Sequence, residues 1–208
     1  RMPAGGIDEI MRLVGEDFLR NMYAPIVEHA VAELPRAHDE IVATLAIEPD
    51  APLGLFGFSA GGAAALLALA CGVLPFRAVA AFAPVVDPVP VVEINARFTG
   101  KEYPWTDDTR ALAAQFDLEA RAGDVAARGA DLLIVSGQDD TLVLAGPAQR
   151  LLSEVRRLRP DLTVESVTVP GVGHPFVAEP GVAAAPQGDP ALRLEGVFTP
   201  WFARRFEV

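Results

Sequence analysis

The segment Leu53–Ala65 most constrains how this chain can fold, because its pattern changes from strand to helix within a few residues. It reads LGLFGF, then SAGG, then a run of alanine and leucine. The apolar hexapeptide predicts a short buried strand, and the run after the glycines predicts a helix. A strand that turns at once into a helix is typical of an α/β fold, in which the two kinds of element alternate.

The turn between these elements is G-F-S-A-G, with Ser59 at its centre. A turn this tight holds a serine in a strained backbone conformation and leaves its hydroxyl accessible at the edge of the sheet. We expect glycine at Gly57 and Gly61 because a Cβ at either position would meet neighbouring backbone. The N–H of Ala60 begins the helix, where the helix dipole favours an oxyanion. The alternative is a glycine-rich turn whose serine only caps the helix.

A nucleophilic serine needs a general base and a group that orients the base, and candidates for both follow in the chain. Asp139 and Asp140 come directly after a predicted strand, Asp131–Ser136. Carboxylates there lie at the carboxyl edge of a parallel sheet, where open α/β proteins place their sites. His174 lies in a glycine loop after the next predicted strand, Thr163–Val169. The order serine, aspartate, histidine is one of the three common orders of serine triads.

The other two histidines have a structural explanation. His29 and His38 fall in segments with helical periodicity, Ala24–Leu34 and Arg36–Ala46, which Pro35 is expected to separate. A solvated histidine, or one at the edge of the core, is the expected reading of both. No such packing reason exists for a histidine in the loop around residue 174, which favours a catalytic role there.

Three motifs together resemble the α/β-hydrolase superfamily: GFSAGG, GQDDTLV and GVGHPF. The chain is similar to its dienelactone-hydrolase-like and prolyl-oligopeptidase-like branch from about Leu53 to the C-terminus. The resemblance implies an α/β-hydrolase fold, a mostly parallel sheet with helices on both faces. It places the acid at the fourth position of G-x-x-D-x-x-V, which is Asp140, with Asp139 as the alternative. Dienelactone hydrolases use cysteine as nucleophile, so Ser59 makes an ester or amide hydrolase the closer match.

Length and composition bound the remaining possibilities. A chain of 208 residues can bury one core but hardly two, so we expect a single α/β-hydrolase domain over residues 1–208. The net charge of −11 disfavours nucleic acid and anionic membrane surfaces as partners. No apolar run approaches the roughly 18 residues of a membrane span, and no signal-peptide pattern is present, so the expected location is the cytoplasm. Length and composition do not indicate an oligomeric state.

Motifs for metals and cofactors are absent from the sequence. No cluster of histidine, cysteine and carboxylate has zinc spacing, and neither a P-loop nor G-x-G-x-x-G occurs. We therefore expect hydrolysis without a metal or cofactor. Cys71, the single cysteine, is expected to be a small buried apolar residue.

The segment 84–115 does not fit a simple alternation of strands and helices, and we expect it to form a lid over the site. Its aromatic residues Phe98, Tyr103 and Trp105 are candidates to line a pocket for the acyl or leaving group. The alternative is an ordinary surface excursion with a few buried anchors. Further helices are predicted at Ile7–Arg20, at Pro147–Arg159 and from Asp189 onward, with another strand at Ala78–Phe82.

The first part of the chain presents a problem for this fold. The 52 residues before Leu53 read as helix, and they contain no H-G turn of the kind that supplies a second oxyanion donor. An elbow strand without neighbours on one side would leave an apolar edge open, which natural proteins avoid. We therefore expect at least two strands and an oxyanion loop upstream of Met2.

These observations predict a serine hydrolase that cleaves a small or medium uncharged carboxylic ester. Ser59 would attack the carbonyl, His174 would accept and return the proton, and Asp140 would orient the imidazole. A peptidase or a thioesterase would share the same residues. A catalytically silent member of the fold that acts as a binding protein is the alternative from another class.

Overall fold

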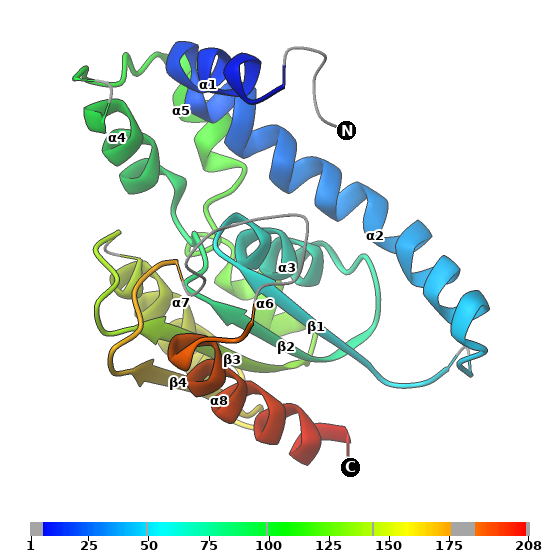
Figure 1. Ribbon diagram of the computed structural model, residues 1–208. Helices are drawn as coiled ribbons and strands as arrows, with labels where there is room; N and C mark the ends of the chain where they lie inside the picture. The colour runs from blue at the N-terminus through cyan, green and yellow to red at the C-terminus, as the bar shows by residue number, and fades with distance from the viewer. Residues whose placement is uncertain (1–5, 49, 99, 143, 176–185, 207–208) are drawn as a thin grey trace.

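A four-stranded parallel sheet forms the centre of the computed structural model, which describes residues 6–48, 50–98, 100–142, 144–175 and 186–206 (Figure 1). Its strands lie in the order of the chain: β1 (Leu53–Phe58), β2 (Phe76–Phe82), β3 (Asp131–Gly137) and β4 (Val164–Val169). All strands are parallel, so their carboxyl ends meet at one edge of the sheet. The segments after β1, β3 and β4 therefore converge there, as the candidate site requires.

Helices cover both faces of this sheet, as expected for an α/β-hydrolase fold. On one face lie α3 (Ala60–Cys71), α6 (Ala122–Ala127) and α7 (Ala145–Leu158), and on the other lies α8 (Asp189–Phe206) (Figure 1). The ring of Phe198 on α8 meets Phe56 of β1 at 4.8 Å between centroids, in an edge-to-face arrangement. Aromatic side chains of α8 thus cover the sheet face opposite α3.

Helix α3 lies in the middle of the core. Its residues 62–70 are all buried, because α2, α6 and the sheet surround it. A helix that is apolar on every side is stable in such a place, and small alanine side chains let its neighbours approach closely. Gly72 ends the helix in the left-handed conformation, with φ of 67°. The strand, turn and helix that carry Ser59 are therefore held by the core itself.

The chain before β1 is helical, as expected, but Pro35 does not interrupt it. The elements are α1 (Gly6–Glu16), the π-helical turn η1 (Leu19–Tyr23) and α2 (Ala24–Leu45), which continues through Pro35. Proline removes one backbone hydrogen bond, but Val31 and Leu34 pack against the core on the preceding turn. That packing keeps the helix continuous, so the predicted break was wrong.

Strand β1 has β2 as its only strand neighbour within the described residues. An apolar groove of about 220 Å³ lies where α2 meets the first residues of β1 and β2, and Ile41, Leu53 and Phe76 are among its lining residues. Phe56 of β1 is 48% exposed. The expectation that further strands exist upstream stays a prediction.

The segment 84–115 contains two helices, α4 (Pro88–Phe98) and α5 (Asp107–Ala114). They lie beside α1, at the end of the molecule above the sheet in Figure 1. The Tyr103 hydroxyl donates to Asp17 Oδ1 at 2.7 Å, which ties this segment to the N-terminal helices. We call α1, α4, α5 and the residues that join α4 to α5 the cap. In the described part of the chain, no helix is long and apolar enough to cross a membrane.

Candidate active site

Ser59 has the strained backbone that the sequence predicts. Its φ is 53° and its ψ is −119°, a region that residues other than glycine rarely adopt. The surroundings impose this conformation, because the Ser59 N–H donates to the carbonyl of Phe82 at 3.0 Å and its own carbonyl accepts from Ala63 at 3.0 Å. Strain of this kind persists only where the structure overdetermines it, and it is concentrated at functional sites.

Only one of the two glycines flanking Ser59 is required by sterics. A Cβ on Gly57 would lie 2.2 Å from the carbonyl oxygen of Gly61, whereas a Cβ on Gly61 would meet nothing within 4 Å. The expectation for Gly61 was therefore wrong, since its open side faces away from the strand. The second close approach belongs to Gly62, where a Cβ would lie 2.9 Å from the Pro84 side chain.

This difference gives a stability prediction. Gly57→Ala should lower the free energy of unfolding by about 3 kcal/mol or more, because strand and helix must separate to admit the methyl group. Gly61→Ala should change it by less than about 1 kcal/mol, since alanine is the better helix former. Urea unfolding of both variants and the parent protein measures this. Equal losses in the two variants would contradict the steric argument.

His174 lies between Ser59 and Asp140. Its Nε2 is 3.0 Å from Ser59 Oγ, and its Nδ1 is 3.0 Å from Asp140 Oδ2. The imidazole is 19% exposed and the carboxylate side chain 7% exposed. The ring of Phe58 lies 5.0 Å from the imidazole, between centroids, and covers part of it. The structure thus brings together three residues that are 34 and 115 positions apart in the chain.

The loops after β3 and β4 are held against each other by backbone contacts. The Asp139 N–H donates to the carbonyl of Val172 at 3.0 Å. A Cβ on Gly137 would lie 2.2 Å from that same carbonyl oxygen, so the two loops touch at a glycine. Asp140 follows Asp139 in one loop, and His174 follows Val172 by two residues in the other. The contact between the two loops therefore fixes the position of the His174 imidazole relative to the Asp140 carboxylate.

Asp140, and not Asp139, faces the imidazole. Burial by itself would raise the pKa of the Asp140 carboxyl group, but the hydrogen bond with His174 and the Leu142 N–H at 2.8 Å outweigh it. The pKa of Asp140 is therefore lowered from its ordinary value, and the group is ionised at neutral pH. Asp139 is exposed to solvent.

Two of the three candidate pocket residues lie together in the cap. Tyr103 and Trp105 line a pocket of about 260 Å³, with ring centroids 4.7 Å apart. Phe98 does not join them: it is 82% exposed at the end of α4. The same pocket is lined by Glu93 and Glu102, which the sequence did not single out. Charged residues on helices and loops are most often solvated, so no signal marks these two in the sequence.

Other candidate residues lie away from the site. Cys71 is exposed, with Sγ 3.6 Å from Arg121, so the expectation of a buried cysteine was wrong. It is the last residue of α3, where the helix leaves the core. His29 is exposed and His38 contacts Asp39 at 3.1 Å on the protein surface. Among the described residues, no group of three or more histidine, cysteine or carboxylate side chains could hold a metal ion.

Comparison with solved structures identifies the fold. The chain resembles the acylaminoacyl peptidase of Pyrococcus horikoshii, with a TM-score of 0.61, 15% identity, and coverage of 85% of this chain and 28% of that one. For the monoacylglycerol lipase of Paleococcus ferrophilus the TM-score is 0.52 and the identity 14%, with coverage of 84% and 76%. For the S-formylglutathione hydrolase of Agrobacterium tumefaciens the values are 0.54 and 18%, with coverage of 84% and 57%. The chain spans only part of each of these proteins.

Sequence comparison identifies the family. No curated protein matches the chain significantly. The model of the prolyl oligopeptidase family matches residues 12–186, which include the elbow, the segment after β3 and the histidine loop. The chain therefore belongs to the prolyl oligopeptidase family and has the α/β-hydrolase fold of that family's hydrolases.

Proposed function

We propose that this chain is a serine hydrolase that cleaves carboxylic esters through an acyl-enzyme on Ser59. The observation that carries the proposal is the position of His174, within 3.0 Å of both Ser59 Oγ and Asp140 Oδ2. These distances are those of a nucleophile with its base and of a base with the group that orients it. The strained elbow that presents the hydroxyl supports the same role.

The geometry suggests how the reaction proceeds. Ser59 Oγ attacks the ester carbonyl while His174 Nε2 takes the hydroxyl proton. The imidazolium then gives this proton to the leaving alcohol, and the carbonyl carbon remains bonded to the serine. In the second half, His174 deprotonates water, and the water oxygen bonds to the acyl carbon. The bond from this carbon to Ser59 Oγ then breaks, the imidazolium returns the proton to Ser59 Oγ, and the acid is released. The ionised Asp140 holds the Nδ1 proton of the histidine throughout and stabilises the positive charge.

The negative charge of the tetrahedral intermediate needs donors nearby. The N–H of Ala60 is the first of α3 and has no acceptor within the helix, so it is available to the oxyanion. The positive end of the helix dipole lies at the same place. The segment 84–115, which contains α4 and α5 of the cap, is proposed to act as a lid that selects the substrate, because it follows the end of β2, where the carbonyl of Phe82 accepts from the Ser59 N–H.

A peptidase is the second candidate, and the family match favours it. Peptide bonds are cleaved by the same three residues, and so are thioesters. An ester is our first choice because its leaving group needs less stabilisation than an amine, and a single oxyanion donor is identified among the described residues. A binding protein that has lost catalysis would have no need of the strained Ser59 or of the ionised Asp140.

Labelling with a fluorophosphonate probe separates the enzyme from the binding protein. An active hydrolase should gain the mass of one probe on Ser59, located by peptide mass spectrometry. A panel of p-nitrophenyl esters, thioesters and aminoacyl amides then ranks the substrates by kcat/KM. Absence of labelling in folded protein would exclude the proposed mechanism, and a preference for amides would select the peptidase.

The pH dependence gives a further prediction. The histidine must be neutral to accept the proton, so kcat/KM should rise with pH along a single limb as the base loses its proton. The pKa of Asp140 is lowered from 3.8, so this group stays ionised from about pH 5 to 9 and adds no second limb. Hydrolysis of a p-nitrophenyl ester across this range measures the profile. A flat profile would argue against His174 as the base.

A further inference from the structure

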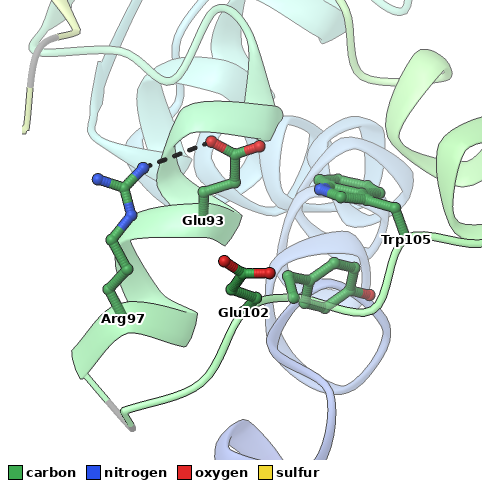
Figure 2. Close-up of a pocket in the computed structure, with 5 residues that line it drawn as sticks. Glu93, Arg97, Glu102 and Trp105 are labelled. Carbon is green, nitrogen blue, oxygen red and sulfur yellow. Dashed lines mark ion pairs between the residues drawn. The ribbon is translucent and has the colours of Figure 1, made fainter.

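The pocket in the cap is open between α4 and the segment 102–105 (Figure 2). It has a volume of about 260 Å³ and is lined by Glu93, Arg97, Glu102, Tyr103 and Trp105. Figure 2 shows the Glu102 carboxylate pointing into the space between the helix and Trp105. None of its lining residues is Ser59, Asp140 or His174.

Two aromatic rings form a corner of this pocket. Tyr103 and Trp105 are 4.7 Å apart, between centroids, with their planes inclined by 65°. The hydroxyl of Tyr103 is held by Asp17, and burial, followed by that hydrogen bond, raises the pKa of the phenol. The ring is therefore fixed and neutral at physiological pH. The guanidinium of Arg110 already lies over the ring of Trp105 at 5.4 Å, so this indole accepts cations.

One of the two carboxylates that line the pocket has no positively charged partner in the described part of the chain. Glu93 pairs with Arg97 at 3.5 Å in an exposed contact. Glu102 has no hydrogen-bond or ion-pair partner among the described residues. The pocket therefore has a negative charge next to two π faces, in a protein whose net charge is −11. Ring faces and a carboxylate both attract a positive charge.

We propose that this pocket binds an organic cation, a primary ammonium or a guanidinium on an apolar stem. The stem would pack on Tyr103 and Trp105, and the charged head would lie beside Glu102. A metal ion suits the pocket less well, because aromatic rings provide no oxygen or nitrogen ligands of the kind that metals take. The space is smaller than the pockets that hold drug-sized ligands, which fits a single side-chain-sized group.

Such a cation has two possible sources. It can be a basic group of the substrate itself, in which case the pocket deepens the proposed hydrolase function. It can also be a free amine that binds independently of hydrolysis. The chemistry of recognition is the same in both cases, so binding is tested first and the source second.

Fluorescence of Trp105 gives a direct readout of binding. The chain has two tryptophans, and Trp201 is only 1% exposed, so a small ligand does not reach it. A change of emission on binding in the pocket therefore comes from Trp105. The Ser59→Ala variant is titrated with n-butylammonium, with n-butylguanidinium, and with n-butanol as the neutral counterpart. We expect saturable changes with the two cations and none with the alcohol. No saturable change with either cation, or an equal response to the alcohol, would overturn the proposal.

Variants of the pocket identify the groups responsible. Glu102→Gln should weaken cation binding by about tenfold, the size expected for one nearby charge in a partly solvated site. Tyr103→Phe keeps the ring and should bind within about twofold of the parent. The control is Glu195→Gln on α8, an exposed carboxylate that lies outside the pocket, which should leave the affinity unchanged. Equal weakening by the two glutamine variants would show a general effect of net charge and refute the site.

Kinetics then identify the source. The p-nitrophenyl esters of 6-aminohexanoate and of hexanoate differ in one ammonium group. If the cation belongs to the substrate, the amino ester has the lower KM, and Glu102→Gln removes that advantage. If it is a free amine, n-butylammonium binds without competing with either ester. Because the binding experiment uses the Ser59→Ala variant, failure of the hydrolase proposal leaves the cation proposal standing, and the reverse also holds.

Discussion

Ser59→Ala is expected to lower kcat/KM for an ester by roughly 10⁴-fold or more, because no other group can form the acyl-enzyme. The imidazole of His174 and its bond to Asp140 remain, but the attack on the carbonyl would then depend on water. Hydrolysis of a p-nitrophenyl ester by purified protein measures this directly. Near-normal turnover in the variant would exclude Ser59 as the nucleophile.

The variant should stay folded, which separates a catalytic effect from a structural one. Alanine removes only the hydroxyl, and the backbone bonds of residue 59 to Phe82 and Ala63 do not involve the side chain. Its free energy of unfolding should lie within about 1 kcal/mol of the parent. Ser153→Ala, at an exposed position of α7, is the matched control and should change neither activity nor stability.

The elbow could be predicted from the sequence because its information is local. A strand, a turn and a helix within 13 residues leave few conformations for Ser59, and the structure has the strained one. The parallel sheet follows from the alternation of elements, since strands separated by helices return in the same direction. The position of Asp140 in the motif G-x-x-D-x-x-V also favoured it over Asp139. In the structure Asp140 Oδ2 lies 3.0 Å from His174 Nδ1.

The features that could not be predicted depend on what lies opposite a residue in space. Nothing in the sequence shows that Gly57 faces backbone while Gly61 faces open space. The exposure of Cys71 depends on where α3 leaves the core, and the continuity of α2 at Pro35 depends on packing that propensity does not describe. The carboxylates of the cap pocket meet the aromatic rings only because α4 and the segment after it fold together.

The two adjacent aspartates provide the sharpest test of the arrangement around the histidine. Asp140→Asn is nearly isosteric, and its side-chain oxygen can still accept from the Leu142 N–H that Asp140 Oδ1 now accepts. Its amide nitrogen would then face His174 Nδ1 and donate to it. That donation favours the tautomer with the proton on Nε2, which cannot accept the proton of Ser59.

We therefore expect Asp140→Asn to lower kcat by about 10³- to 10⁴-fold with little change in KM. Asp139→Asn should lower it by less than about threefold, because an exposed carboxylate that does not touch the imidazole carries no proton chemistry. The N–H of residue 139, which bonds to the carbonyl of Val172, is retained in that variant, so the loop keeps its contact. Steady-state kinetics on one ester compares the two variants, with urea unfolding to show that both are folded. A larger loss in Asp139→Asn would move the orienting role to that residue and contradict the geometry, since only Asp140 lies within 3.0 Å of the ring.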